Sequence, residues 1–247
     1  MVIEAHSFSF IGARQNNEDA LYPQQNQSSQ NERVFVVCDG MGGYSHGGLV
    51  SAKVCVALSD LSSFHTTIDQ KIVVSTLRDL QKELQLNFDS IASPYSGTTI
   101  AMVVFNNNNA LIANLGDSRV YQIRTNSEKK IIYKSKDHSL VQDLFDKGEI
   151  SEDQLMTHPK RNIITKAFMP FQDTFIFPDF YKLEDIQAGD YFFICSDGVW
   201  ENLNDKDLLN LLHENISNTM KTKKIAEHCR FSKDNYTACL IQIVEYP

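Results

Sequence analysis

Three apolar runs in the sequence each end in an aspartate beside a glycine. They are VFVVCDG at 34–40, ALIANLGD at 110–117 and YFFICSDG at 191–198. An apolar run of this length is typical of a buried strand, so we expect each aspartate where a strand leaves the core. One Asp-Gly pair after a strand is usually only a turn, but three carboxylates at three strand ends suggest one shared site.

Other acidic residues occur in motifs that could join this site. The candidate carboxylates are Glu18, Asp19, Asp39, Asp117, Asp197 and Asp234. Carboxylates that share a cavity repel and raise one another's pKa values unless a cation compensates them. Mg²⁺ and Mn²⁺ prefer oxygen ligands and keep several waters, so a few carboxylates and the carbonyl of Gly40 could hold two ions. Zinc is disfavoured, because the sequence has no histidine pair or cysteine cluster at ligand spacing.

Two such ions would suit the hydrolysis of a phosphate ester. Ions about 3.5 to 4 Å apart lower the pKa of a bridging water and stabilise the attacking and leaving oxygens of an in-line displacement. Arg14, four residues before Glu18, supplies a guanidinium that can grip two phosphate oxygens. Phosphoryl transfer depends mainly on positioning and charge neutralisation, so no serine or cysteine nucleophile is required.

The composition limits the class of protein. The chain has 247 residues, of which 42% are hydrophobic, and we expect one domain over 1–247. The formal net charge of −8 argues against nucleic acid or a membrane surface as a partner, since both bind clustered Lys and Arg. No signal-peptide pattern or membrane-length apolar run is present, so we expect a soluble cytoplasmic protein. The five cysteines lack CxxC spacing, which disfavours disulfides and thiolate metal sites.

Hydrophobic periodicity predicts the elements that position these residues. Strands are expected at 33–38 and 191–196, and a three-stranded antiparallel meander at 98–124. Apolar residues at three- and four-residue spacing predict helices in 48–64 and 69–88, and two more near the C-terminus. Strands interrupted by helix pairs indicate an α+β fold: two packed antiparallel sheets flanked by helix pairs, a four-layer α/β/β/α sandwich.

The motifs, taken in order, resemble the metal-dependent protein phosphatases (PPM, type 2C), and especially their bacterial serine/threonine phosphatase branch. The resemblance covers the chain from about residue 8 onward. It rests on RQNNEDA, VCDGMGG, SGTT, NLGDSRVY, KDHSLVQ, HPKRNIITKAF, GDYFFICSDGVWENL and KDNYTACLI. It implies the same sandwich, two core Mn²⁺ or Mg²⁺ ions, and a flexible flap at about 145–170.

The resemblance implies roles for the first set of candidates. Asp39 is similar to the carboxylate that bridges both core metals, and Gly40 to its neighbouring carbonyl ligand. Asp197 and Asp234 are similar to the other ligands of the first metal. Asp39 and Asp197 would thus serve catalysis through the metals, and a water bridging the two ions would be the nucleophile.

The remaining candidates match other positions of the family. Glu18 and Asp19 match those that hold the second metal and its waters, and Arg14 matches the phosphate-binding arginine. Asp117 is similar to a residue that helps to hold a third, weaker ion. Asn235 completes the family's Asp-Asn pair. It is expected to orient the metal-binding side chains without contacting a metal itself.

Some features leave alternatives open. Animal members carry a histidine where this chain has Met41, and bacterial members often have one at Tyr44. The leaving-group acid is therefore open between His46 and a metal-bound water. His46 could instead be a capping or surface residue at a helix start. The GDSR stretch could also be an ordinary turn in which Asp117 pairs with Arg119.

The leading hypothesis is a phosphoserine/phosphothreonine protein phosphatase that acts on a phosphorylated protein, either a Ser/Thr kinase or its targets. An alternative is an inactive phosphatase-like regulatory module that binds a phosphoprotein. The intact carboxylates count against it, because a pure binding module has no need for charges that only metals can neutralise. A small phosphate ester as substrate is a third possibility.

Overall fold

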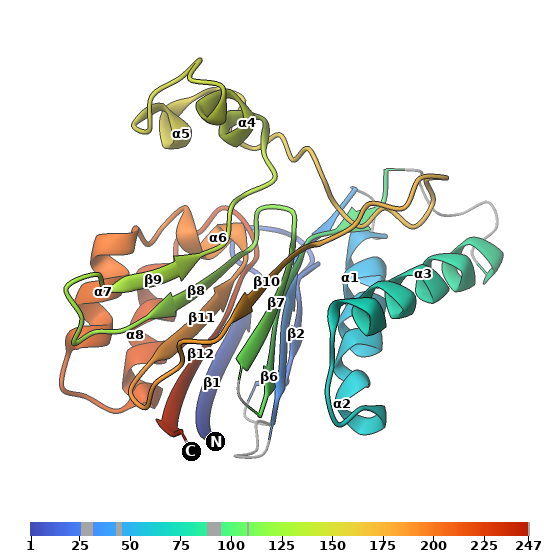
Figure 1. Ribbon diagram of the computed structural model, residues 1–247. Coiled ribbons are helices and arrows are strands. Elements are labelled where there is room, and N and C mark those ends of the chain that lie inside the picture. Colours follow the sequence, from blue (N-terminus) through green and yellow to red (C-terminus); the bar gives the residue numbers. More distant parts are fainter. Residues whose placement is uncertain (26–31, 43–45, 88–94, 108, 247) are drawn as a thin grey trace.

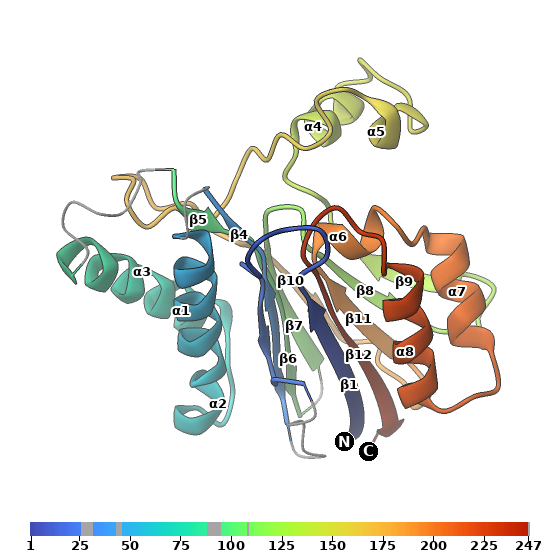
Figure 2. The ribbon, with the colours of Figure 1, turned by 180° about the vertical axis from the view of Figure 1, so that it is seen from behind.

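Two five-stranded antiparallel sheets pack face to face at the centre of the molecule, with helices on both outer sides (Figures 1 and 2). The computed structural model describes residues 1–25, 32–42, 46–87, 95–107 and 109–246. The predicted α+β, four-layer α/β/β/α sandwich is confirmed. Over these ranges no helix has the length and apolar character needed to cross a bilayer.

The first sheet has the strand order β1-β12-β11-β8-β9. Its strands are β1 (Val2–Phe10), β12 (Tyr236–Glu245), β11 (Tyr191–Cys195), β8 (Arg119–Ile123) and β9 (Ile131–Lys134). The helices on its outer side are α6 (Asp197–Trp200), α7 (Asp205–His213) and α8 (Asn218–His228), as Figure 2 shows. Their apolar residues pack with the outer face of this sheet in one buried cluster.

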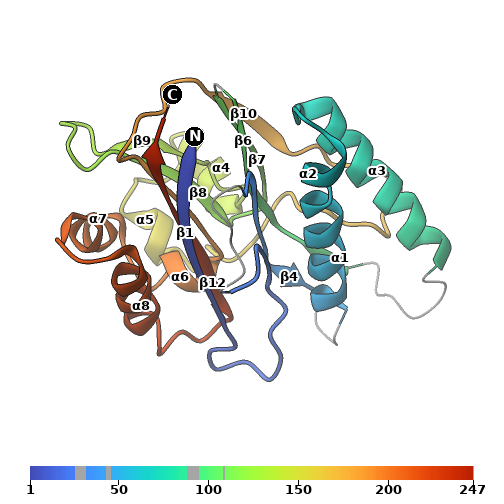
Figure 3. The same cartoon turned by 90° about the horizontal axis from the view of Figure 1, so that it is seen from below.

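The second sheet has the order β10-β7-β6-β3-β2. Its strands are β10 (Asp179–Leu183), β7 (Asn109–Leu115), β6 (Ile100–Asn106), β3 (Val34–Cys38) and β2 (Ala20–Tyr22). The helices α1 (Gly47–Ser59), α2 (Leu61–Phe64) and α3 (Gln70–Asn87) cover its outer face, opposite α7 and α8 (Figure 3). A short ribbon of β4 (Gly40–Met41) and β5 (Gly97–Thr98) lies beside α1.

Apolar periodicity explains both packing layers. Val73, Leu77 and Leu84, on one stripe of α3, are fully buried in a cluster that also contains residues of α1 and of the second sheet. Between the sheets, Phe105 packs edge-on against both Phe35 and Phe192, with ring centroids 5.9 and 4.9 Å apart. Such edge-to-face contacts add to the hydrophobic stabilisation of the core.

The predicted three-stranded meander at 98–124 is wrong in its last strand. β6 and β7 form a hairpin in the second sheet, but β8 pairs with β9 and β11 in the first sheet. The chain crosses between the sheets at residues 116–118. Gly116 has φ +100°, and a Cβ atom there would lie 2.5 Å from Cγ2 of Thr99, so this crossover requires glycine. Periodicity shows that a run is buried but not which sheet it joins.

A long excursion, residues 135–178, leaves the sandwich between β9 and β10 and carries α4 (Leu140–Asp146) and α5 (Gln154–Thr157) above the sheet ends (Figure 1). Backbone bridges join Ser139 to Ile164 and Thr98 to Phe168 at its base. Nε of Arg161 lies 3.4 Å from Oε1 of Glu201, at the end of α6. The predicted flap at about 145–170 falls within this excursion, and its flexibility stays a prediction.

Candidate active site

The three strand-end aspartates meet at one edge of the sandwich. Asp39 directly follows β3, Asp117 lies in the crossover between β7 and β8, and Asp197 begins α6 after β11. The carboxyl groups of Asp39 and Asp197 are in hydrogen-bonding contact. Burial raises the pKa of Asp39 well above its ordinary value, and the nearby charges of Asp19 and Asp117 raise it too. The structure therefore brings together side chains that are far apart in the sequence.

Two threonines of the SGTT motif hold the backbone of Asp39. Its N–H donates to Oγ1 of Thr99 at 2.9 Å, and its carbonyl accepts from Oγ1 of Thr98 and from N of Thr99, both at 2.9 Å. The hydroxyl of Thr99 also bonds that of Ser118 at 2.7 Å, and both residues are fully buried. Thr99 thus ties Asp39 to the crossover that carries Asp117.

Gly40 lies in a backbone crossing that leaves no room for a side chain. Its N–H donates to the carbonyl of Glu18 at 3.2 Å. A Cβ atom at Gly40 would lie 2.5 Å from the backbone of Gly47 and 2.6 Å from the carbonyl oxygen of Glu18. Glycine is required here because the backbone of three segments comes together beside Asp39.

The carboxylate of Asp19 points into the same buried region. Its Oδ2 accepts a hydrogen bond from Oγ of Ser196 at 2.8 Å. The pKa of Asp19 is raised to about 7, mainly by burial and also by the charges of Asp197 and Asp234, whereas hydrogen bonds from Thr237 and Ser196 oppose the rise. Asp19 therefore resists ionisation unless a positive charge joins it.

Several carboxylate oxygens in this region are buried and have no hydrogen-bond partner among the residues that the structure describes. They are Oδ1 of Asp19, Oδ1 of Asp117 and Oδ1 of Asp197. Burial, together with the charge of Asp234, raises the pKa of Asp197 to about 6. Burial and the charge of Asp197 raise the pKa of Asp117 well above its ordinary value. Buried polar atoms are normally paired, so these oxygens fit a hard divalent cation.

The carboxylates do not form a closed ligand cluster by themselves. Over the described ranges no three His, Cys, Asp or Glu side chains are grouped closely enough to hold an ion alone.

Arg14 and Asp234 form an ion pair that the sequence did not predict. Nη2 of Arg14 lies 2.5 Å from Oδ2 of Asp234, and the Arg14 side chain is 57% exposed. This hydrogen bond is the largest cause of the raised pKa of Arg14. Arg14 is therefore accessible at the rim of the site, where an anion could reach it.

Asn235 supports the loop that carries Arg14 and Glu18. Its Oδ1 accepts from N of Glu18 at 2.8 Å, and its Nδ2 donates to the carbonyls of Ile11 and Asn16 at 2.8 and 2.9 Å. The side chain is buried and uses three of its hydrogen-bonding positions on this one loop. This geometry agrees with the predicted orienting role, which itself stays a prediction.

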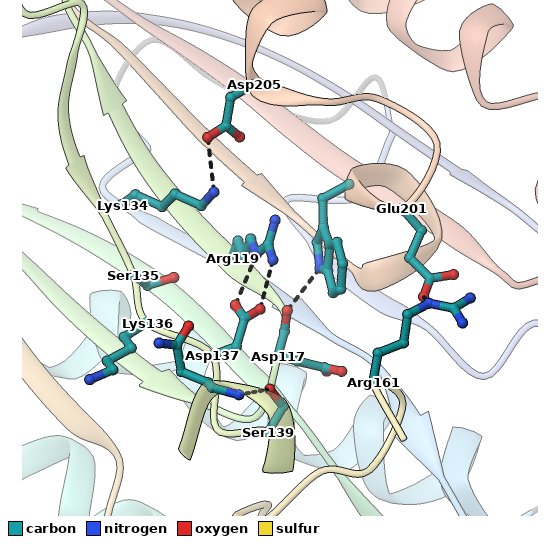
Figure 4. Close-up of polar contacts among 12 residues, drawn as sticks. Asp117, Arg119, Lys134, Ser135, Lys136, Asp137, Ser139, Arg161, Glu201 and Asp205 are labelled. Carbon is teal, nitrogen blue, oxygen red and sulfur yellow. Dashed lines mark hydrogen bonds and ion pairs between the residues drawn. The ribbon is translucent and has the colours of Figure 1, made fainter. Parts of the chain in front are cut away.

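A buried arginine and a tryptophan fix the backbone around Asp117 (Figure 4). The guanidinium of Arg119 makes two hydrogen bonds to Asp137, at 2.9 and 2.7 Å, so the alternative in which it pairs with Asp117 is wrong. The ring of Trp200 lies 3.7 Å from the guanidinium carbon, and its indole N–H donates to the carbonyl of Asp117 at 2.9 Å. A bidentate carboxylate satisfies Arg119 better than a neighbour two residues away.

His138 was not predicted as part of the site, yet it holds the base of the excursion to the crossover. Its Nδ1 accepts from N of Gly116 at 3.0 Å, and its Nε2 lies 3.1 Å from Oδ2 of Asp179. Its backbone N–H donates to Gly116, and its carbonyl accepts from Thr165, both at 2.9 Å. The DHSL motif marked this residue, but a contact across the fold is not visible from the motif.

The leaving-group acid stays a prediction. His46 directly precedes α1, but its side chain makes no capping hydrogen bond among the described residues, so of the two other interpretations only that of a surface residue stays open. Its Nδ1 is buried and has no partner within the described part of the chain. Tyr44, the other position at issue, lies outside the described residues.

Comparisons with known proteins agree with this geometry. The family model of protein phosphatase 2C matches residues 4–143, which is more than half of the 247-residue chain. The serine/threonine phosphatase stp of Listeria welshimeri is 28% identical over 228 residues, which cover 87% of this chain and 86% of that protein.

Solved structures show the same fold. Serine/threonine phosphatase Stp1 from Staphylococcus aureus superposes with a TM-score of 0.82 and 29% identity, covering 99% of this chain and 96% of that one. The catalytic domain of the phosphatase PstP, in complex with two manganese ions, superposes with a TM-score of 0.80 and 25% identity, covering 99% of both chains. The chain belongs to the protein phosphatase 2C family, as its motifs predicted.

Proposed function

We propose that this chain is a metal-dependent phosphatase that removes phosphate from phosphoserine and phosphothreonine in proteins. The observation that carries the proposal is the set of buried, unpartnered carboxylate oxygens on Asp19, Asp117 and Asp197. Three separate segments supply them, and within the described part of the chain none of these three carboxylates forms an ion pair, since Arg14 is paired with Asp234 and Arg119 with Asp137. Burying such charges is costly unless a cation compensates them.

The ligand assignment follows the positions of the side chains. Asp39, at the contact with Asp197, would face both core ions, with the Gly40 carbonyl beside it. Asp197 and Asp234 would complete the first Mn²⁺ or Mg²⁺ site, and Glu18 and Asp19 the second. Asp117 would help to hold a third ion. When bound, the ions neutralise these carboxylates and increase the acidity of the attacking water.

The residues of the chain perform the other tasks. Arg14 grips the phosphate oxygens, since its guanidinium lies at the accessible rim and can bind them in a bidentate manner. Asn235 keeps the Arg14 loop in place, and Thr99 sets the backbone of Asp39. Fixed positions matter because phosphoryl transfer depends on alignment and charge neutralisation.

The similarity to bacterial serine/threonine phosphatases supports a phosphoprotein substrate, either a Ser/Thr kinase or a target of one. The net charge of −8 disfavours nucleic acid and anionic membranes as partners. We infer action in the cytoplasm, because the five cysteines are free and buried, as is usual in a reducing compartment. The whole of 1–247 would act as one catalytic domain, with the flap at 145–170 covering the site.

The test is hydrolysis of a phosphothreonine peptide and of para-nitrophenyl phosphate by the purified chain with Mn²⁺, Mg²⁺ or EDTA. We expect turnover with either ion and none with EDTA, and restoration when excess Mn²⁺ is added back. A folded chain that binds Mn²⁺ but hydrolyses neither substrate would refute the proposal in favour of a regulatory phosphoprotein-binding module.

A further inference from the structure

An exposed apolar surface adjoins Arg14. Phe10 and Ile11, at the end of β1, are 42% and 43% exposed, and Phe231, after α8, is 81% exposed. No other large hydrophobic side chain in the described part of the chain has a greater exposed fraction than Phe231. Single exposed apolar residues are ordinary, but several gathered beside a catalytic rim are typical of a binding surface. We call these three residues the apolar shelf.

Backbone contacts keep the two halves of the shelf together. Phe10 lies opposite Tyr236 in the β1–β12 ladder, and the two rings stack with centroids 5.2 Å apart. Beyond the ladder, N of Ala13 donates to the carbonyl of Ser232 at 3.2 Å. The carbonyl of Ile11 accepts from Asn235, and N of Arg14 donates to that same carbonyl, at 3.4 Å. The loops that carry Ile11, Arg14 and Phe231 are thus held next to one another by these contacts.

Three cations lie on these loops, and two of them have acidic neighbours: Arg14 is paired with Asp234, and Arg230 lies 3.9 Å from Glu227. Arg230 and Lys233 flank Phe231 and are both exposed, and Arg14 lies on the adjoining loop. The guanidinium of Arg230 lies 4.6 Å from the centroid of the Phe231 ring, a cation–π contact that orients the ring. A surface that combines apolar side chains with arginine and lysine complements a segment that is apolar and negatively charged.

We propose that the apolar shelf docks the residues that flank the phosphorylated residue of a protein substrate. This inference rests on the proposed function. With the phosphate held at Arg14, an extended peptide advances about 3.3 to 3.6 Å per residue, so a side chain two to four positions away reaches roughly 7 to 14 Å from it. The shelf adjoins Arg14, so the segment that binds there is the one next to the phosphoresidue. The enzyme prefers phosphopeptides with an apolar residue within about four positions of the phosphoresidue.

The test compares a peptide with a small substrate. Phe231→Ala should lower kcat/KM for a phosphothreonine peptide that carries leucine near the phosphoresidue by about five- to tenfold, because the leucine loses its apolar contact. The same variant should leave kcat/KM for para-nitrophenyl phosphate unchanged, since this molecule has no flanking residues. A panel with one leucine at each position from −4 to +4, in a serine background, locates the contact.

Two controls separate docking from general effects. Phe64 on α2 is 79% exposed and lies in the helical layer on the other side of the sandwich. Phe64→Ala should therefore leave kcat/KM unchanged for both the peptide and para-nitrophenyl phosphate. Replacing the leucine of the peptide with serine should lower kcat/KM of the wild type by the same five- to tenfold factor. The same replacement should not lower kcat/KM of Phe231→Ala any further, because in a double-mutant cycle the contact is already lost.

The outcomes are distinguishable. Equal losses for peptide and small substrate, or no loss for any peptide of the panel, would overturn the docking surface while leaving the proposed phosphatase intact. If Met156→Ala in α5 lowered peptide turnover selectively and Phe231→Ala did not, the excursion would be the docking face and the shelf would be rejected. Failure of the wild type on both substrates would overturn the proposed function and the docking that rests on it.

Discussion

Buried carboxylates occur in two regions of the molecule with opposite surroundings. Asp190, before β11, is fully buried, and it accepts hydrogen bonds from Arg124 at 2.7 Å, from Gln122 at 2.9 Å and from N of Gln187 at 3.0 Å. At the strand ends, Oδ1 of Asp19 and of Asp197 have no partner over the described ranges. Burial alone therefore does not mark a functional carboxylate, whereas a buried carboxylate without its counterion does.

The difference has a physical cause. Arg124 also pairs with Asp185, so its positive charge is shared within the corner that joins β10 to β11. At the strand-end site, the guanidinium of Arg14 is paired with Asp234 and that of Arg119 with Asp137. Within the described residues, neither arginine forms an ion pair with Asp19, Asp117 or Asp197. The first region stabilises the fold, and the second leaves negative charge for a cation.

The largest expected effect comes from removing the carboxylate at the centre of the site. Asp39→Asn should lower kcat by about a thousandfold, which corresponds to ~4 kcal/mol, because both ions lose a ligand. Steady-state kinetics with saturating Mn²⁺ checks this loss. Asp143→Asn, on the exposed part of α4, is the matched control and should keep normal turnover. Retained activity in Asp39→Asn would place the metal site elsewhere.

Substitution of Asp190, in the region where the buried carboxylate is paired with Arg124, should change stability and not metal binding. Asp190→Asn should lower the free energy of unfolding by about 3 kcal/mol, since it removes the fully buried carboxylate that pairs with the partly buried Arg124. Urea unfolding measures this change, and calorimetry should show Mn²⁺ affinity equal to that of the wild type. A variant that lost Mn²⁺ affinity but kept its stability would reverse the contrast between the two regions.

Divalent cations should stabilise the protein in a pH-dependent manner. The pKa values of Asp19 and Asp197 are raised to about 7 and about 6 in the folded protein. Because the folded protein binds these two protons more tightly than the unfolded chain does, protonation of Asp19 and Asp197 stabilises the metal-free protein in EDTA. This contribution is complete below about pH 4, the ordinary pKa of an aspartate, and is lost as the pH rises through the raised pKa values, to about 7. Mn²⁺ at about 100 times its Kd should add ~2.7 kcal/mol. The difference between Mn²⁺ and EDTA in urea unfolding should widen across this range, and a constant difference would contradict the assignment.

The smallest expected effect tests the link between Asp39 and Asp117. Thr99→Val keeps the side-chain shape but removes hydrogen bonds to Asp39 and Ser118, so it should cost about 1 kcal/mol of stability and weaken Mn²⁺ binding several-fold. Thr99→Ser, which keeps the hydroxyl, should bind Mn²⁺ as the wild type does. Equal Mn²⁺ affinity in both variants would show that the hydroxyl does not position the site.

Much of the architecture was predictable from sequence, because strand and helix periodicity is local. The buried runs that end at Asp39 and Asp197 and the apolar stripe of α3 are all as predicted. The sheet that β8 joins was not predictable, since the crossover at Gly116 depends on contacts with Thr99 and His138 from distant segments.

The acidic residues of the candidate site were predictable from the sequence, but the side-chain contacts that they and their neighbours make were not. Strand-end aspartates indicate a shared carboxylate site, the position of Arg14 four residues before Glu18 indicated a phosphate contact, and the family motifs added Asn235. The bidentate contact of Arg119 with Asp137, the hydrogen bond from Trp200 to Asp117 and the ion pair of Arg14 with Asp234 depend on side-chain direction in three dimensions. No sequence spacing encodes them.

The most direct measurement is a crystal structure with Mn²⁺, with anomalous diffraction recorded at the manganese edge. We expect two strong anomalous peaks at the strand ends, within bonding distance of Asp39, with Asp197 and Asp234 at the first peak. A weaker third peak beside Asp117 would complete the prediction. Manganese density on the surface alone, with Asp39 and Asp197 still in contact with each other, would contradict the metal site and the hydrolysis that depends on it.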